Sequence, residues 1–187
     1  IDAKDDLSIQ VHPDDAYAKA HENGSLGKTE CWFILDCKEN ATLVVGHNAK
    51  TKEELEQMIH EGRWKEFIRE IPIKPGDFIQ IDPGTVHAIK GGTLLLETQQ
   101  SSDITYRVYD YDRLSNGKPR QLHIVQSIDV ITVPAKSADN SVVHIEKKDD
   151  AIQQLIQCPY YTVYRIDVEH RVETWQDKPF ALMSVVE

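Results

Sequence analysis

Long apolar runs are absent from this sequence of 187 residues. The longest stretches, such as the one within residues 41–46, fall far short of the roughly 20 residues that a bilayer-spanning helix needs. The opening residues also lack the charged and apolar regions of a secretory signal. The sequence therefore predicts no membrane-spanning segment and no membrane partner.

Cysteine is scarce, with only Cys31, Cys37 and Cys158 in the chain. An odd number of cysteines without a CxxC pair argues against a disulfide framework. A reducing compartment is the simplest setting for three free thiols. We therefore expect a cytoplasmic protein.

Positive charge is also in short supply. The chain has 21 Lys and Arg residues against 31 Asp and Glu residues, which gives a net charge of −10. A surface this negative repels nucleic acids and anionic membranes, so neither is expected as a partner. An anionic ligand would need a local cluster of basic side chains to overcome that field.

What the sequence does contain is a series of short strands with turns between them. Residues 7–12 alternate apolar and polar side chains, which places Gln10 and His12 on one face of a strand. Further strands are predicted over 30–36, 42–46, 71–73, 78–81, 85–89, 93–99, 104–109, 142–146, 160–168 and 180–187. Gly and Pro residues separate these short segments at close intervals, which indicates an antiparallel sandwich or barrel.

Helical signals are fewer. Pro13 and the two aspartates after it predict a short helix over 13–21. Thr51 and Glu54 form a capping box, followed by helical spacing over 52–69, as one helix or as two broken near Gly62. Residues 125–129 suggest another short helix. The fold class is therefore mainly β with a helical segment inserted at about 50–70.

A polar stretch over 134–140 indicates a linker and a boundary near residue 135. Residues 1–135 then form one domain, and 136–187 form a linker and the first strands of a second β domain. The sequence starts inside a patterned segment and stops inside a predicted strand, so we expect a fragment that lacks material at both ends.

Four polar residues occur where apolar or turn residues are expected. Gln10 and His12 share a strand face, Glu30 opens a strand, and His87 follows the turn at 82–84. Two imidazoles, a carboxylate and an amide oxygen form a mixed nitrogen and oxygen set that suits a divalent metal such as zinc. The joint pattern predicts a single metal site.

These residues also carry a resemblance. Gln10-x-His12, then Glu30, then the glycines at 76 and 84 before His87 are similar to the two metal-binding motifs of the cupin superfamily. The stretches 8–15, 27–32, 83–88 and 97–113 resemble the type I mannose-6-phosphate isomerases of the short Gram-positive kind. The resemblance runs over essentially the whole chain, and it implies a cupin-type antiparallel β-barrel, or jelly roll.

The resemblance further implies an enzyme that interconverts mannose 6-phosphate and fructose 6-phosphate. One zinc ion per chain would be held by the positions that match Gln10, His12, Glu30 and His87. The family's active-site arginine matches Arg107, and the lysine of its Gly-Lys-x-Glu motif matches Lys28. The 136–187 segment would begin the family's C-terminal cupin half.

The roles of two of these residues stay open. Arg107 is expected either to stabilise a developing oxyanion or to hold the substrate phosphate by a bidentate contact. Lys28 lies two residues from Glu30, on the same face of an extended segment, and is a candidate proton-transfer group. The sequence does not identify the general base. The remaining histidines lack partners at ligand spacing and are assigned surface or structural roles: His21, His47, His60, His123, His144 and His170.

Two other functions compete with the isomerase. A cupin iron dioxygenase also uses two histidines and a carboxylate, but has less use for Lys28 and Arg107. A non-catalytic sugar-binding cupin would be expected to have lost at least one ligand, and none of the four is missing. The oligomeric state is left open.

Overall fold

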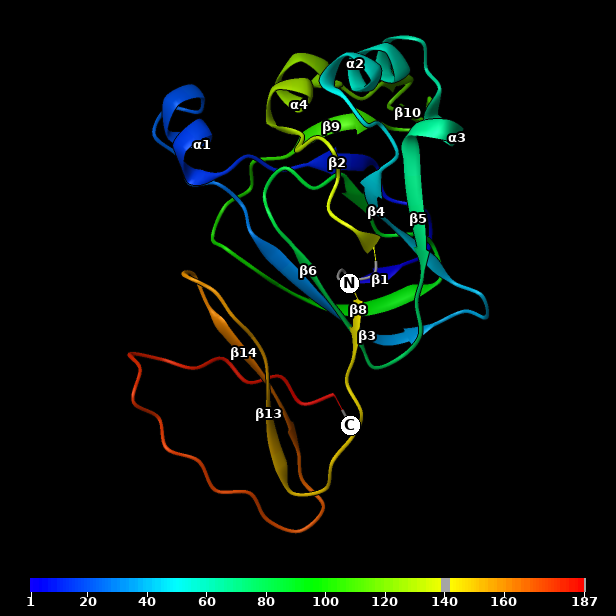
Figure 1. The fold of residues 1–187 in the computed structure, drawn as a ribbon. Coiled ribbons are helices and arrows are strands. Elements are labelled where there is room, and N and C mark those ends of the chain that lie inside the picture. The colour runs from blue at the N-terminus through cyan, green and yellow to red at the C-terminus, as the bar shows by residue number, and fades with distance from the viewer. Residues whose placement is uncertain (139–141, 187) are drawn as a thin grey trace. The chain divides into compact units, whose positions relative to one another are not determined.

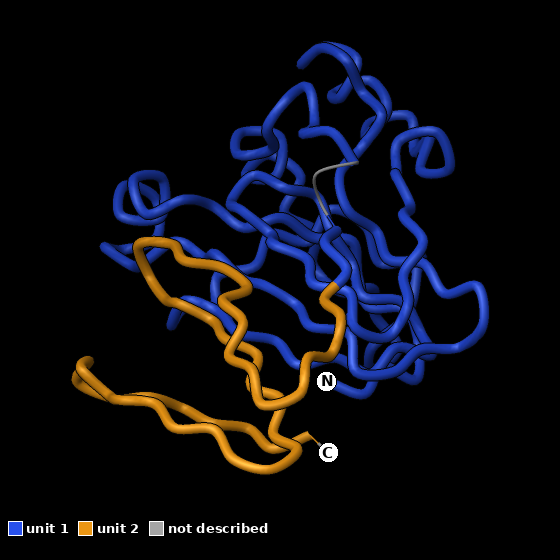
Figure 2. Tube along the Cα trace, turned by 60° about the horizontal axis from the view of Figure 1, so that its bottom comes forward, with its two compact units in different colours: residues 1–144 blue, residues 145–187 orange. Residues whose placement is uncertain are grey.

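The computed structural model describes residues 1–138 and 142–186 (Figure 1). The chain divides into two compact units, residues 1–144 and residues 145–187 (Figure 2). Each unit is described by itself. Among the described residues, no helix has both the length and the apolar character needed to cross a bilayer.

The first unit contains two antiparallel sheets of five strands each. In spatial order, the first sheet consists of β1 (Asp2–Ala3), β8 (Thr93–Gln99), β3 (Glu30–Cys37), β6 (Asp77–Ile81) and β12 (Val142–His144). The second consists of β5 (Ile68–Pro72), β4 (Thr42–His47), β7 (His87–Ala88), β2 (Ile9–Val11) and β9 (Tyr106–Tyr109). The predicted mainly β, antiparallel fold is confirmed.

Residues along a strand alternate between the two faces of its sheet. One apolar cluster contains side chains from a face of each of the two sheets. The first sheet contributes Trp32 and Ile79, and the second contributes Leu43 and Val45. All four side chains are at most 2% exposed. The inward faces of the two sheets therefore enclose a common interior, and polar side chains on those faces point into it.

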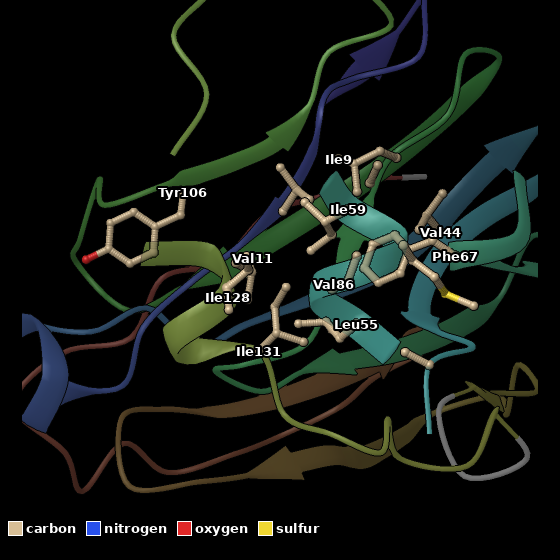
Figure 3. Close-up of a cluster of buried hydrophobic side chains, with 14 residues drawn as sticks. Ile9, Val11, Val44, Leu55, Ile59, Phe67, Val86, Tyr106, Ile128 and Ile131 are labelled. Atoms are coloured by element: carbon tan, nitrogen blue, oxygen red, sulfur yellow. The ribbon is translucent and has the colours of Figure 1, made fainter. Parts of the chain in front are cut away.

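A second cluster covers the opposite face of the second sheet. The helices are α1 (Asp15–His21), α2 (Lys52–His60), α3 (Trp64–Phe67) and α4 (Ile124–Val130). Leu55 and Ile59 of α2 and Ile128 of α4 pack against Ile9 and Val11 of β2 (Figure 3). The second sheet, which carries Gln10 on β2, is therefore covered by apolar side chains on both faces. This packing holds the backbone of β2 in place.

The predicted helical segment over 52–69 is interrupted and ends early. Gly62, with a φ of 66°, separates α2 from α3, as one of the two alternatives expected. The extension to Arg69 is wrong, because Ile68 and Arg69 already belong to β5, in which Ile68 lies opposite His47 of β4. Pairing with a neighbouring strand outweighs a local helical preference that is worth only tenths of a kcal/mol per residue.

The end of the first unit differs in position from the domain boundary expected near residue 135. Strand β12 pairs with β6, with Val143 opposite Phe78, and so belongs to the first unit. A division at 135 would separate β12 from the sheet that it completes. Residues 139–141 of the predicted linker lie outside the described residues.

The second unit contains one antiparallel hairpin, made of β13 (Ala151–Gln157) and β14 (Thr162–Asp167). Strand β14 matches the strand predicted over 160–168, whereas β13 was not predicted. The strand predicted over 180–187 is wrong for residues 180–186, which form no strand, and residue 187 lies outside the described part. In the first unit, residues 114–119 contain a pair of two-residue antiparallel strands, β10 (Leu114–Ser115) and β11 (Lys118–Pro119).

Gly84 shapes the turn that precedes His87. Its φ is +79°, a region that L-residues with a side chain rarely occupy. Its amide donates a hydrogen bond to the carbonyl of His12 at 2.9 Å. The space where a Cβ would stand is already filled by Thr132 Oγ1 and the carbonyl of Val130. The turn therefore depends on glycine for both its conformation and its packing.

Gly84→Ala is expected to lower the free energy of unfolding by about 2–4 kcal/mol, since it adds a steric overlap to backbone strain. Gly24→Ala is the matched control, because Gly24 has a φ of +83° but nothing within 4 Å of the added Cβ. It should cost only about 1 kcal/mol of strain. Urea denaturation of both variants measures the difference, and equal losses would contradict the packing argument.

Candidate metal centre

Three strands of the second sheet place three predicted site residues in a row. Gln10 on β2 lies opposite His87 on β7 and, on its other side, opposite Arg107 on β9. Residues directly opposite one another in an antiparallel pair project to the same face of the sheet. The neighbours Val86 and Ala88 pack in the cluster beneath the helices, so His87 projects to the interior between the sheets.

Glu30 comes from the other sheet and meets the two histidines there. Its Oε2 lies 3.3 Å from His12 Nε2, and its Oε1 lies 3.4 Å from His87 Nε2. The three side chains are each no more than 1% exposed. Their ligand atoms all lie within 4.8 Å of one another, a spacing at which they could hold one metal ion.

Both imidazole rings are held with Nε2 toward Glu30. Nδ1 of His12 donates to the carbonyl of Ile104 at 2.8 Å, and Nδ1 of His87 donates to the carbonyl of Thr85 at 2.8 Å. Because a carbonyl can only accept, Nδ1 carries the hydrogen in the neutral ring and Nε2 offers its lone pair. A backbone contact of this kind is the usual way in which proteins orient a metal-ligating histidine.

Within the described part of the chain, three polar atoms at the centre of this group are buried and form no hydrogen bond: His12 Nε2 and both carboxylate oxygens of Glu30. Leaving such atoms unsatisfied costs free energy, so their presence points to a bound species that completes the site. The donor set of two imidazole nitrogens and a carboxylate suits a divalent transition metal.

The pKa shifts are consistent with a site that is ready for a cation. Burial lowers the pKa of His87 to about 4, so the ring is neutral at neutral pH. Burial alone would raise the pKa of Glu30, but contact with His12 and the proximity of His87 and Lys28 lower it to about 2. The group thus offers a neutral imidazole at His87 and an ionised carboxylate at Glu30, the protonation states that metal binding requires.

The structure brings Lys28 into the same group. Its Nζ lies 3.0 Å from Glu30 Oε2, and the residue is 9% exposed. A buried ammonium group beside a carboxylate is held by charge pairing. Lys28 therefore occupies the edge of the candidate metal centre, as its two-residue spacing from Glu30 predicted.

Gln10 is adjacent to the group through its amide. Gln10 Nε2 lies 3.3 Å from His87 Nε2. Turning the amide by 180° would present its oxygen at this point instead, and the oxygen is the atom that a metal would use. The predicted fourth residue is therefore next to the other three.

Arg107 shares their sheet face but forms no hydrogen bond or ion pair with His12, Glu30 or His87 in the described part of the chain. Its Nη1 donates to the carbonyl of Gln121 at 2.9 Å, and its Nε is buried with no hydrogen-bond partner among the residues described. Two further arginines, Arg113 and Arg120, lie close by, bound to Asp110. The three guanidinium groups form a local basic cluster in a protein whose net charge is −10.

Glu97 is a carboxyl group that sequence reasoning missed. It lies opposite Trp32 in the pairing of β8 with β3, and its neighbour Leu95 belongs to the cluster between the sheets. Burial and the negative charge of Glu30 raise its pKa, while Lys28 lowers it. The alternation of Thr93, Leu95 and Glu97 in the sequence was the signal that Glu97 faces inward.

The chain matches individual proteins and solved structures, but no protein-family model matches it. The chain is 52% identical over 188 residues to the mannose-6-phosphate isomerase ManA of Bacillus subtilis, an alignment that covers all of this chain and 60% of that protein. It is 48% identical over 187 residues to the mannose-6-phosphate isomerase of Streptococcus mutans, with coverage of 100% and 58%.

Solved structures agree. The crystal structure of the Bacillus subtilis mannose 6-phosphate isomerase superposes with a TM-score of 0.76 at 49% identity, covering 88% of this chain and 52% of that one. A putative mannosephosphate isomerase from Archaeoglobus fulgidus shares the fold, with a TM-score of 0.59 at 21% identity and coverage of 76% and 44%.

Fold and site together define a mainly β protein with a candidate metal centre between two sheets. Over its whole length the chain is homologous to the mannose-6-phosphate isomerases of Bacillus and Streptococcus. It spans at most 60% of the length of these relatives.

Proposed function

We propose that this protein is a zinc-dependent aldose–ketose isomerase that interconverts mannose 6-phosphate and fructose 6-phosphate. The observation that carries the proposal is the convergence of His12, Glu30 and His87 in a chain that is about half identical to mannose-6-phosphate isomerases. Gln10 would complete the ligand set for one zinc ion per chain. Zinc would act there as a Lewis acid on the oxygens at C1 and C2 of the sugar.

The chain's own residues would carry the proton movements. The reaction moves a proton from C2 to C1 and needs groups that hold protons beside the sugar. Lys28 is buried next to Glu30 and is suited to stabilise or protonate a substrate oxygen. Glu97 faces the same interior with a raised pKa, which favours it as the group that accepts the proton from carbon.

Arg107 and its neighbours would hold the charged end of the substrate. Arg113 and Arg120 are both bound to Asp110, so the single carboxylate offsets only one of their two charges. Arg107 adds a third guanidinium near them. A phosphate group placed at this cluster would be attracted against the overall negative charge of the protein.

We also propose that the first unit, residues 1–144, is the metal-binding cupin domain expected over 1–135, and that the residues after it, within the expected 136–187 segment, begin a second cupin-like domain. An isolated two-stranded sheet is at best marginally stable in water. The hairpin of β13 and β14 leaves Ile152, Tyr164 and Ile166 exposed on its surface. Such a hairpin is expected to need further strands. A cytoplasmic location remains the expectation.

A coupled assay tests the function. Mannose 6-phosphate should be converted to fructose 6-phosphate by this chain or by a longer protein that contains it, and chelation of zinc should abolish the conversion. Oxygen consumption and iron content, measured on the same samples, test for a dioxygenase. Zinc binding without turnover of the sugar would contradict the isomerase proposal and favour a sugar-binding role.

A further inference from the structure

Lys28 reaches the candidate metal centre from a segment without regular structure. Residues 25–29 form neither helix nor strand, and strand β3 begins only at Glu30. Lysine has a flexible four-carbon side chain, so the place of its ammonium group depends on how firmly the backbone that carries it is held. Other residues must therefore hold the backbone of Lys28 if its Nζ is to stay 3.0 Å from Glu30 Oε2.

The chain that leads into α1 lies directly against this segment. The amide of Lys28 donates to the carbonyl of Pro13 at 3.0 Å. At Gly27, a Cβ would lie only 2.5 Å from the amide nitrogen of Asp15. The absence of a side chain at Gly27 is what permits the two backbones to approach so closely.

Gln100 joins this contact through its side chain. It is 7% exposed and follows the last residue of β8. Its Oε1 accepts from the amide of Thr29 at 3.3 Å, and its Nε2 donates to Oδ1 of Asp15 at 2.7 Å. Because a backbone amide can only donate, the contact with Thr29 decides which end of the side-chain amide faces Asp15. The same Oδ1 accepts from the amide of Gly27 at 2.8 Å, so Gln100 holds both neighbours of Lys28, one directly and the other through Asp15.

The backbone of Gln100 contacts the same segment independently. Its amide donates to the carbonyl of Thr29 at 2.8 Å, one bond beyond the ladder between β8 and β3. Its carbonyl accepts from the amide of Ser102 at 2.7 Å, and Ser102 Oγ donates to the carbonyl of Leu26 at 2.9 Å. These bonds do not depend on the side chain at position 100. A substitution there should therefore leave β3 and β8 paired.

We propose that Gln100 is a positioning residue for Lys28. Its side-chain amide and the carboxylate of Asp15 hold the backbone on both sides of Lys28, so that the ammonium group stays buried beside Glu30. In the described part of the chain, the Gln100 side chain forms no hydrogen bond with the predicted metal ligands. Its expected effect on turnover rests on the proposed function, whereas its effect on the position of Lys28 does not.

Acetylation of lysines measures the position of Lys28 without any turnover. An N-hydroxysuccinimide ester of acetate modifies accessible amines, and peptide mass spectrometry gives the rate at each lysine. Gln100→Met keeps the size of the side chain but removes its hydrogen bonds, so it should raise the rate at Lys28 by about tenfold. Lys52 of α2, whose Nζ donates to the carbonyl of Ile128, should change by less than about twofold. An unchanged rate at Lys28, or equal increases at both lysines, would overturn the proposal.

Two more variants complete the labelling experiment. Gln57→Met is the matched control, because it makes the same substitution at an exposed side chain of α2 whose amide donates to Glu61. It should leave the rate at Lys28 unchanged. Asp15→Ala removes the partner of the Gln100 amide and should raise the rate at Lys28 in the same direction. That variant decides the matter if Q100M does not fold, and an unchanged rate in it would overturn the proposal.

Turnover distinguishes an effect through Lys28 from any other effect of Gln100. Gln100→Met should lower kcat by about tenfold and leave KM within about twofold, because a displaced Lys28 impairs proton transfer rather than substrate binding. In a Lys28→Met background, the same change should cost less than about twofold, since the group that Gln100 positions is gone. Equal losses in both backgrounds would overturn the proposal. A protein that labels as expected but converts no mannose 6-phosphate would contradict the proposed function and support the positioning of Lys28.

Discussion

His87→Ala is expected to remove the bound metal and the isomerase activity while leaving the β-rich fold in place. His87 supplies one of only two imidazoles at the centre, so its loss should weaken zinc binding by more than about 100-fold. The side chain belongs to neither apolar cluster, and the strand pairing of β7 uses its backbone. The expected cost in stability is about 1–3 kcal/mol, because the Thr85 carbonyl loses its donor.

Metal content by elemental analysis and secondary structure by circular dichroism measure these two effects separately. His60→Ala is the matched control, since His60 ends α2 and is exposed. That variant should keep one zinc per chain. Unchanged zinc content in His87→Ala would show that the ligand is misassigned and would remove the main support for the proposed function.

Arg107→Met is expected to keep the metal and to lose turnover by about 100-fold or more, the usual effect of removing a charged group that stabilises a developing anion. Arg107 lies on the same sheet face as Gln10 and His87, and in the described structure it forms no hydrogen bond or ion pair with the two histidines or Glu30. Metal binding should therefore not change. Full activity with an unchanged KM would contradict a role of Arg107 in the reaction and would indicate a structural role.

Arg107→Lys separates the two roles left open for this residue. Lysine keeps the charge but cannot form a bidentate contact with phosphate. A rise in KM with little change in kcat would identify Arg107 as a phosphate-binding residue, whereas equal falls in kcat and kcat/KM would identify a contact made only in the transition state. Either pattern would be measured with the coupled assay.

The sequence predicts the strands well where short apolar runs are bounded by turn residues, and poorly where the pairing partner decides the outcome. Strands β3 and β8 begin at the residues expected, because a short apolar run between turn residues favours a buried strand. Strand β5 was assigned to a helix at its start, since Ile68 and Arg69 continue a helical spacing. At residues 180–186 the sequence predicts a strand, but this apolar segment has no partner strand among the described residues and forms none.

The candidate site shows the same division. Gln10, His12, Glu30 and His87 are predicted from residue type and spacing, since metal ligands are polar groups at positions that should be apolar or turn-like. Lys28 is predicted from the resemblance to a known family. Glu97 is not among the predicted residues, because a carboxylate at the end of a strand usually faces solvent. The burial of His47, whose Nδ1 has no hydrogen-bond partner among the described residues, appears only in the coordinates.

The sequence by itself determined which residue types were available: two imidazoles, a carboxylate, an amide and a lysine, at or beside strand positions. It also determined the net negative charge, against which a cluster of basic side chains stands out. Only the tertiary structure decided that Glu30 from one sheet meets His12 beside β2 and His87 of the other sheet. The physical reason is that side-chain direction follows from local backbone geometry, whereas distances between strands far apart in the chain follow from how the sheets pair and pack.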